Sequence, residues 1–354
     1  VIRRSLSSHT PQRRKPRVVL ARLAERPQAD APMYGPGSPT DVLENRLAGL
    51  LGKEKALFFP TGTMAQQVAL RIHALRSGRP SFAAHPKNHL DLWEQQGYNA
   101  VHGLHFQRVG DPNALMTRED LAALGEPVAA VLWELPQREI GGPLPTWDEL
   151  CEQVATVRAT GAATHLDGAR LWEAQTFYER PFAEIAALFD TVYVSLYKGL
   201  QGIRGAVLAG DAATIAEAGV WRWRLGGQIP DAWPLALAAL DGLDNVLPRM
   251  PVFRDHAVAL AAAINADGLA TTVPLVPQTP MFHVHLPVGR AAAVEAAAAM
   301  LEETGTHLFG GAAGSPLPGR SVFEVSVGEN ALAFEPKELA ALLRELVERA
   351  RAAG

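Results

Sequence analysis

The chain has 354 residues and a mass of 38.0 kDa, of which 48% are hydrophobic and 20% charged. It is therefore too long for a small module and too apolar for a disordered or fibrous chain. A net charge of −4, with a pI near 6.3, gives no electrostatic reason to expect a nucleic-acid partner.

The single cysteine excludes an internal disulfide and a cysteine-based zinc site, and it favours a reducing, cytoplasmic compartment. The longest strongly apolar stretches, such as Ala257–Ile264, are far shorter than the roughly 18 residues that a membrane span needs. The first twenty residues are basic and have no apolar core, unlike a secretory signal. We expect a soluble, cytoplasmic protein with no membrane partner.

Residues 1–33 are predicted to form an N-terminal arm, which is basic and contains proline. At this length a run of like charge is more often a solvated arm that packs across a subunit than a nucleic-acid tail. A helix is predicted from Asp41, where Thr40 or Asp41 can cap it, and Gly52 ends its leucine repeat. Residues 56–59 are predicted to form a short buried strand.

The middle of the chain alternates between helices and short apolar strands. The absence of polar alternation in these strands indicates a mostly parallel sheet that helices bury on both faces. The predicted helices span 64–75 and 147–160, and the predicted strands span 128–133, 163–166, 191–195 and 206–209.

From residue 248 the pattern becomes βαβ-like and more polar. The predicted helices there span 256–266, 291–301 and 336–352, and the predicted strands span 281–286 and 321–326. We therefore predict an α/β fold with a large domain over 34–247 and a smaller C-terminal α+β domain over 248–354.

Two charged residues follow neighbouring predicted strands. Asp167 follows the strand 163–166, and Lys198 follows the strand 191–195. Ligands in open α/β sheets bind outside the carboxyl ends of the parallel strands, where both residues fall. Taken separately, Asp167 is also typical of a helix cap, and Lys198 of a surface residue.

Taken together, the two residues predict a pyridoxal phosphate (PLP) site. A lysine buried among apolar strands has a lowered pKa and can form a Schiff base with a carbonyl. A buried aspartate needs a cationic partner, and a protonated pyridine nitrogen is one. A Schiff-base lysine and an aspartate at the ring nitrogen form the recognised signature of PLP.

Four ordered motifs resemble the low-specificity threonine aldolase and β-eliminating lyase family of fold-type-I PLP enzymes. The motifs are Tyr34–Thr40 followed by Leu43-Glu44, Pro60–Met64, His165–Leu171 and Ser195–Leu200. The resemblance runs from about residue 34 to 210. It implies a large PLP-binding domain, a smaller C-terminal domain, an amino-acid substrate, and a homodimer or homotetramer.

The turn Thr61, Gly62 and Thr63 leads into a predicted helix, whose first N–H groups and dipole favour a phosphate. An ordinary threonine N-cap is the alternative. The resemblance implies that this turn and Ser195 hold the cofactor phosphate. It also implies that His89 stacks on the pyridine ring and lies near the base of the aldol step.

Other polar residues compete for roles at this site. Glu134 matches a family position near the cofactor, although an ordinary loop carboxylate is the alternative. His85, His102 and His105 compete with His89, but no His-x₃-His pair with a third fixed partner stands out. We predict no metal site.

Two arginines are candidates for the substrate carboxylate, because a guanidinium suits a bidentate carboxylate. The resemblance implies this role for Arg170, which it also places near the cofactor, and more loosely for Arg320. The family's amino-terminal Ser-Asp-Thr is replaced by Ser8-His9-Thr10, so Ser8 is a further candidate for substrate binding.

The sequence departs from the family at residues 225–230, where an arginine that reaches the neighbouring subunit's phosphate is missing. Pro230 cannot replace that arginine. Arg204, Arg222 and Arg224 are the candidate substitutes, and we favour Arg204 because it lies in the loop after Lys198.

These residues predict a PLP-dependent lyase that cleaves the Cα–Cβ bond of a β-hydroxy-α-amino acid to glycine and an aldehyde. Lys198, His89 and Asp167 are its predicted catalytic residues. The first alternative is β-elimination from a serine- or cysteine-like amino acid, with Lys198 as the Cα base. The second is a PLP-fold protein that has lost catalysis and serves as a binding or regulatory partner.

Overall fold

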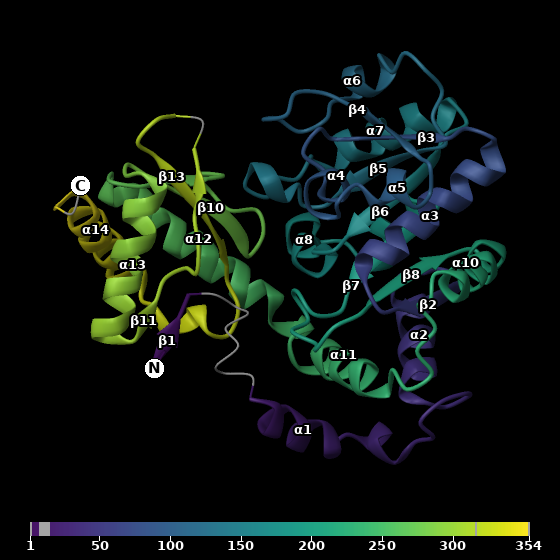
Figure 1. Cartoon of the computed structure of the whole chain (residues 1–354), viewed down its shortest axis with the longest axis horizontal. Helices are drawn as coiled ribbons and strands as arrows, with labels where there is room; N and C mark the ends of the chain where they lie inside the picture. Colours follow the sequence, from purple (N-terminus) through teal and green to yellow (C-terminus); the bar gives the residue numbers. More distant parts are fainter. Residues whose placement is uncertain (1, 7–14, 316, 353–354) are drawn as a thin grey trace. The chain divides into compact units, whose positions relative to one another are not determined.

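The computed structural model describes residues 2–6, 15–315 and 317–352, and within these ranges the chain forms two compact units (Figure 1). The large unit comprises Leu20–Glu139 and Leu144–Leu247. The small unit comprises Val1–Val19, Ile140–Pro143 and Pro248–Gly354. The division of the chain into an N-terminal arm (1–33), a large domain (34–247) and a small domain (248–354) stays a prediction.

The large unit is built on the predicted mostly parallel sheet, with the order β2-β8-β7-β6-β5-β3-β4. From β7 to β4 the neighbours pair in parallel, whereas β8 is antiparallel to both β2 and β7. The strands are β2 (Lys55–Phe59), β3 (Ser81–Ala84), β4 (His105–Arg108), β5 (Ala130–Glu134), β6 (Ala163–Gly168), β7 (Thr191–Ser195) and β8 (Ala206–Gly210).

Every residue of β5, β7 and β8 is buried, which accounts for the predominance of apolar residues in these strands. Neither β3 nor β4 was predicted from the sequence. Both are short, and β4 is a largely polar edge strand that leaves His105 and Arg108 exposed. An edge strand buries little surface, so it carries little hydrophobic signal.

Helices flank this sheet (Figure 1). Alternate strand residues, including Phe59, Tyr193 and Leu208, pack with Val68 and Ile72 of α3 in one core cluster. The helices are α2 (Pro39–Leu50), α3 (Gly62–Ser77), α4 (His89–Trp93), α5 (Gly97–Ala100), α6 (Arg118–Ala122), α7 (Trp147–Ala159), α8 (Leu171–Tyr178), α9 (Phe182–Ala187), α10 (Ala212–Arg224) and α11 (Trp233–Asn245), with 3₁₀ turns η2 (Pro27–Asp30), η3 (Arg138–Ile140) and η4 (Leu247–Arg249).

The start of α2 differs from the prediction. The cap is Ser38, whose hydroxyl accepts a hydrogen bond from the Asp41 backbone N–H at 3.3 Å, and not Thr40 or Asp41. Pro39 occupies the first helical position, where its missing N–H costs nothing and its fixed φ suits the helix.

The predicted N-terminal arm contains a helix, α1 (Pro16–Ala24). Arg22, in the last turn of α1, forms an ion pair with Asp241 of α11 at 3.1 Å. Arg26, two residues after the helix, forms ion pairs with Asp241 and Asp244. Basic residues at the end of this arm are therefore paired with acidic residues of the large unit.

The small unit contains an antiparallel sheet with the order β12-β13-β10-β9, so the βαβ-like prediction is wrong for β10 and β13. Both strands alternate between buried and partly buried residues along most of their length, which is typical of a sheet covered on one face. The elements are α12 (Met250–Asp267), β9 (Thr271–Val273), β10 (Met281–Leu286), α13 (Arg290–Thr304), β12 (Ala313–Gly314), β13 (Ser321–Ser326), η5 (Ala331–Ala333) and α14 (Pro336–Ala352), with β1 (Arg4–Ser5) parallel to β11 (Thr306–His307).

Among the described residues, no helix is both long and apolar enough to cross a membrane.

Candidate active site

Three ionisable residues come from the carboxyl ends of adjacent parallel strands. Glu134 ends β5 and is paired in register with Asp167 of β6, which is paired in turn with Tyr193 of β7. Lys198 lies in the loop that follows β7. The sheet therefore brings Glu134, Asp167 and Lys198 to one edge, where α/β sheets bind their ligands.

Asp167 and Lys198 influence each other's charge. Asp167 is 1% exposed and accepts a hydrogen bond from the Ala169 N–H at 3.0 Å. Burial raises the pKa of Asp167, while the positive charge of Lys198 acts in the opposite direction. Burial and then Arg170 lower the pKa of Lys198, which Asp167 opposes. In the described part of the chain, the Lys198 amine has no hydrogen bond or ion pair.

Glu134 is buried beside this pair. Burial, and next the negative charge of Asp167, raise the pKa of Glu134 to about 7. Its carboxylate accepts hydrogen bonds from the Arg138 N–H and from the Gln137 amide, both at 3.3 Å. The Gln137 amide also donates to the Lys87 carbonyl at 3.1 Å, so Glu134 is held in a fixed position.

His89 begins α4 and is oriented by a buried carboxylate. Its Nδ1 lies 3.0 Å from Glu94 Oε1, and the Glu94 side chain is 2% exposed. Gln67 of α3 donates to the other Glu94 oxygen at 3.3 Å. His89 is close enough to Asp167 and Glu134 to lower the pKa of both carboxyls.

The predicted phosphate-binding turn forms the start of α3. The Thr61 hydroxyl caps the helix by accepting from the Met64 N–H at 3.2 Å, and Thr61 and Thr63 are exposed. A Cβ at Gly62 would lie 2.1 Å from the Tyr193 hydroxyl oxygen, so only glycine lets α3 start this close to β7. The exposed N–H groups of this 16-residue helix suit an anion.

Ser195 and Arg170 lie at the same end of the sheet. Ser195 ends β7, is fully buried, and accepts a hydrogen bond from the Tyr197 N–H at 3.5 Å. Arg170 precedes α8 and is 8% exposed, with its Nε 3.6 Å from Glu173. Its effect on the Lys198 pKa places the Arg170 charge near that amine.

The three candidate substitutes for the missing arginine have different surroundings. Arg204 is exposed, and its guanidinium lies 4.7 Å from the centre of the Tyr197 ring. Arg222 is half-buried and donates to the Phe58 carbonyl, and Arg224 lies over the Trp221 ring. Arg222 also lines a cavity of about 490 Å³ together with the Tyr34–Glu44 segment and residues 228–230.

Two predicted substrate-binding residues remain, Arg320 and Ser8. Arg320 is exposed and precedes β13 in the small unit, where burial and then the charge of Arg320 lower the pKa of His285. Ser8 lies outside the described residues. Their roles remain predictions.

Several residues that support the site were not predicted from the sequence, notably Gln67, Gln137 and Tyr193. Gln67 carries a weak signal, because it lies among the apolar residues Ala65, Val68 and Ala69 of α3 and is buried with them. Tyr193 also follows a pattern, since it shares one face of β7 with Thr191 and Ser195 and alternates with Val192 and Val194. Gln137 has no local signal.

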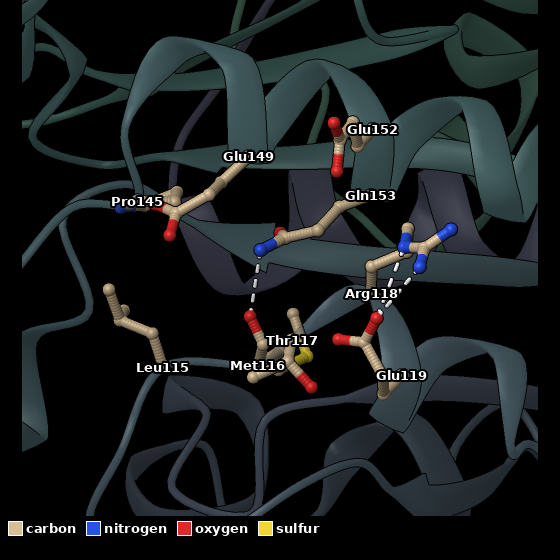
Figure 2. Close-up of a pocket in the computed structure, with 9 residues that line it drawn as sticks. All are labelled: Leu115, Met116, Thr117, Arg118, Glu119, Pro145, Glu149, Glu152 and Gln153. Carbon is tan, nitrogen blue, oxygen red and sulfur yellow. Dashed lines mark hydrogen bonds and ion pairs between the residues drawn. The ribbon is translucent and has the colours of Figure 1, made fainter.

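A second cavity, of about 340 Å³, is lined by residues 115–119, Pro145 and three residues of α7 (Figure 2). Its polar groups are largely satisfied within the protein. Gln153 donates to the Met116 carbonyl at 2.8 Å and accepts from Trp133, while Arg118 pairs with Glu119. We assign no function to this cavity.

The residues present fit PLP. The buried Asp167 carboxylate accepts a single hydrogen bond in the described part of the protein, which leaves it able to pair with a cationic ring nitrogen. Lys198 supplies an amine of lowered pKa, and the start of α3 supplies phosphate donors. Among the described residues, no group of three or more His, Cys, Asp or Glu side chains could hold a metal ion.

Comparisons with known proteins agree with this geometry. The family model described as β-eliminating lyase matches residues 17–287. Low-specificity L-threonine aldolase 1 of Arabidopsis thaliana is 29% identical over 281 residues, which are 76% of this chain and 78% of that protein.

Two solved structures are similar over nearly the whole chain. A candidate L-allo-threonine aldolase from Listeria monocytogenes EGD-E has a TM-score of 0.91 and 37% identity, covering 98% of this chain and 96% of that one. A candidate aromatic amino acid β-eliminating lyase/threonine aldolase from Exiguobacterium sp. 255-15 has a TM-score of 0.89 and 36% identity, covering 98% and 97%.

Proposed function

We propose an activity for this chain, which belongs to the β-eliminating lyase family. The protein is a PLP-dependent carbon–carbon lyase. It cleaves the Cα–Cβ bond of a β-hydroxy-α-amino acid and releases glycine and an aldehyde. The fold-type-I architecture predicted from the sequence is confirmed. The observation that carries the proposal is the placement of Lys198, Asp167 and His89 at one sheet edge, in a chain whose relatives are named threonine aldolases.

Three parts of the chain would hold the cofactor. Lys198 would bind its aldehyde carbon, Asp167 its ring nitrogen, and the turn Thr61–Thr63 with Ser195 its phosphate. When bound, PLP supplies an electron sink for the charge that bond cleavage leaves on Cα. Arg204 is our candidate for an additional phosphate ligand.

Asp167 keeps a proton on the ring nitrogen. Its burial makes an isolated negative charge costly, so the carboxylate is stabilised only when a cation lies beside it. The Ala169 N–H fixes the orientation of the carboxylate. An ion pair formed in this water-poor position stabilises charge more strongly than one in solvent.

His89 acts as the base for the substrate hydroxyl, directly or through a water that it positions. If its Nδ1 donates to Glu94, its Nε2 carries the free lone pair and can accept a proton. Gln67 holds Glu94 in place, so the imidazole keeps one orientation. Loss of the hydroxyl proton lets the β-carbon leave as an aldehyde.

Arg170 binds the substrate carboxylate in this proposal. Its guanidinium is buried and lies near Lys198, where the amino group of a substrate must arrive. A planar guanidinium can hold both carboxylate oxygens and thereby orient the bond to be broken. Arg320 and Ser8 are secondary candidates.

A second candidate activity is β-elimination from a serine- or cysteine-like amino acid, with Lys198 removing the Cα proton. The family description and the description of the Exiguobacterium structure both name β-eliminating lyases. The lowered pKa of Lys198 suits a base as well as a nucleophile.

The two activities release different products. The PLP-loaded protein is incubated with β-hydroxy amino acids such as threonine and phenylserine, and separately with amino acids that carry a β-leaving group. We expect aldehyde and glycine in equal amounts from the first set. Release of a keto acid and ammonia from the second set, with no aldehyde from the first, would replace the aldolase assignment by β-elimination.

We also propose that the enzyme is cytoplasmic and assembles as a homodimer or homotetramer. Tyr34 is 69% exposed, and its neighbour in the chain, Met33, is exposed as well. Ile229, which lines the same cavity as Tyr34, is also exposed. Exposed apolar side chains of this kind would suit a contact between subunits. The single cysteine is consistent with a reducing compartment.

A further inference from the structure

A cavity lies at the opposite end of α3 from the phosphate-binding turn. It has a volume of about 330 Å³ and is lined by the last turns of α3, the turn into β3 and the loop before β4. Because each residue of α3 rises about 1.5 Å, the lining residues from Arg71 to Gly78 lie about 14 to 24 Å along the helix from Gly62. It is therefore separate from the candidate active site.

Two arginines line this cavity without a carboxylate partner in the described part of the chain. Arg71 donates to the His102 carbonyl, and its Nε is buried with no hydrogen-bond partner there. Arg79 donates to the Val128 carbonyl at 3.1 Å. Each guanidinium keeps further N–H groups that these bonds do not use.

His102 provides a third polar group. It is 4% exposed and lines the cavity, yet its ring makes no hydrogen bond with any described residue. The ring contacts Trp221 edge-on at 6.3 Å. A ring nitrogen of His102 is therefore available to donate a hydrogen bond to a ligand in the cavity.

The cationic groups are held in place before any ligand arrives. Arg71 lies over the Trp221 ring at 5.1 Å, so the ring and the His102 carbonyl together fix its guanidinium. At the end of α3, the Ser77 hydroxyl donates to the carbonyls of His73 and Ala74, and Gly78 ends the helix in the left-handed conformation. Preorganised donors lose little entropy on binding.

We propose that this cavity binds a tetrahedral oxyanion, either free phosphate or the phosphate group of a small metabolite. Its donors come from three segments: Arg71 from α3, Arg79 from the turn after it, and His102 from the loop before β4. A phosphate can accept from three directions, whereas a planar carboxylate is satisfied by one guanidinium. The described lining residues include no acidic side chain to repel an anion.

The proposal is tested by calorimetric titration of the PLP-loaded enzyme at constant ionic strength, since the cofactor then fills the phosphate site at the start of α3. The probes are inorganic phosphate, glycerol 3-phosphate and acetate. We expect saturable binding of one phosphate or phosphate ester per chain, and much weaker binding of acetate. A preference for the ester would identify a metabolite as the ligand, and equal affinities would identify free phosphate.

Variants connect the binding to the cavity. Arg71→Gln and Arg79→Gln should each weaken phosphate binding by about tenfold or more, because each removes a charge-assisted hydrogen bond. Arg158→Gln is the matched control, since Arg158 is an exposed arginine near the end of α7 that donates to the Ala187 carbonyl at 3.2 Å.

Absence of saturable phosphate binding, or the same affinity in all three variants, would overturn the proposal. Acetate binding as tight as phosphate binding would overturn the tetrahedral specificity. If Arg71→Gln does not fold, the Arg79→Gln variant decides the outcome by itself, because Arg79 lies beyond the end of the helix.

Discussion

At the scale of single residues, Lys198 and Asp167 offset the cost of each other's burial. Burial alone favours the neutral form of both groups, and each charge favours the charged form of the other. Arg170 shifts this balance at Lys198 toward the neutral amine, which is the form that attacks a carbonyl. The reactivity of the lysine therefore depends on two charged neighbours at the end of β6.

Replacing Lys198 by alanine should abolish both turnover and the covalent attachment of the cofactor. One other described lysine, Lys87, follows a parallel strand, β3, but its amine donates a hydrogen bond to Asn113 at 2.9 Å, so we expect no amine to take the place of Lys198. Visible absorbance before and after borohydride reduction measures the attachment. Lys87→Ala is the control, because Lys87 bonds to Asn113 and should leave the absorbance unchanged. A Lys198→Ala protein that still holds a borohydride-reducible cofactor would identify a different lysine.

Replacing Asp167 by asparagine should leave PLP bound but lower kcat by about a hundredfold or more, because a neutral amide cannot hold the proton on the ring nitrogen. The side chain keeps its shape and its contact with the Ala169 N–H. Equilibrium dialysis of PLP and steady-state rates separate binding from catalysis. Near-normal rates with normal PLP binding would exclude the role that we assign to Asp167.

At the scale of elements, α3 is joined to the sheet by a buried polar bridge. The Thr191 hydroxyl of β7 lies 2.9 Å from His73 Nε2 on α3 and 2.8 Å from His165 Nδ1 on β6. Both histidines are buried, and burial lowers the pKa of His73 to about 4 and that of His165 to about 3. The bridge therefore holds the helix to the strands while both imidazoles are neutral.

This bridge predicts a loss of stability in acid. Unfolded histidines bind protons near pH 6.5, and the buried ones do so only near their lowered pKa values. The stabilisation is therefore present above pH 6.5 and is lost as the pH falls toward 4, by at most about 1.4 kcal/mol per pH unit for each histidine.

Urea unfolding between pH 7 and pH 4.5 measures this slope. His73→Gln should reduce the slope, whereas His105→Gln, on the exposed edge strand β4, should leave it unchanged. Equal slopes in the wild type and in His73→Gln would show that His73 does not carry the effect.

The loop after β7 carries the proposed substitute for the missing arginine. Arg204→Ala should weaken PLP binding by roughly ten- to a hundredfold, because a charge-assisted hydrogen bond to phosphate contributes about 1.5–3 kcal/mol. Arg222→Ala and Arg224→Ala are the matched controls and should do little, since both guanidinium groups have other contacts. Measured PLP dissociation constants that are equal and near wild type for all three would mean that the phosphate needs no such cation.

At the scale of the whole molecule, the exposed side chains of Met33 and Tyr34 lie in the segment that joins the N-terminal helix to α2. We predict at least a homodimer in the PLP-loaded state, because the family resemblance implies that the segment Tyr34–Thr40 contributes to a neighbouring subunit's site. Multi-angle light scattering of the active enzyme measures the mass. A monomer near 38 kDa that retains full activity would contradict the prediction.

The sequence by itself determined the elements whose signals are local. The strands 191–195, 281–286 and 321–326 and the helix 336–352 have the predicted bounds, because alternating apolar residues mark the strands and apolar residues at helical spacing mark the helix. The placement of Asp167 and Lys198 at neighbouring strand ends also followed from the order of the elements. These features depend on residues close together in the chain.

Tertiary structure decided the rest. The antiparallel pairing of β10 with β13 and the edge position of β4 depend on which surfaces each strand meets, which no single segment encodes. The bond from Gln67 to Glu94 and that from Gln137 to Lys87 join residues 27 and 50 positions apart. A sequence pattern shows that a polar residue is present, but only packing brings its partner within hydrogen-bond distance and so determines its protonation and orientation.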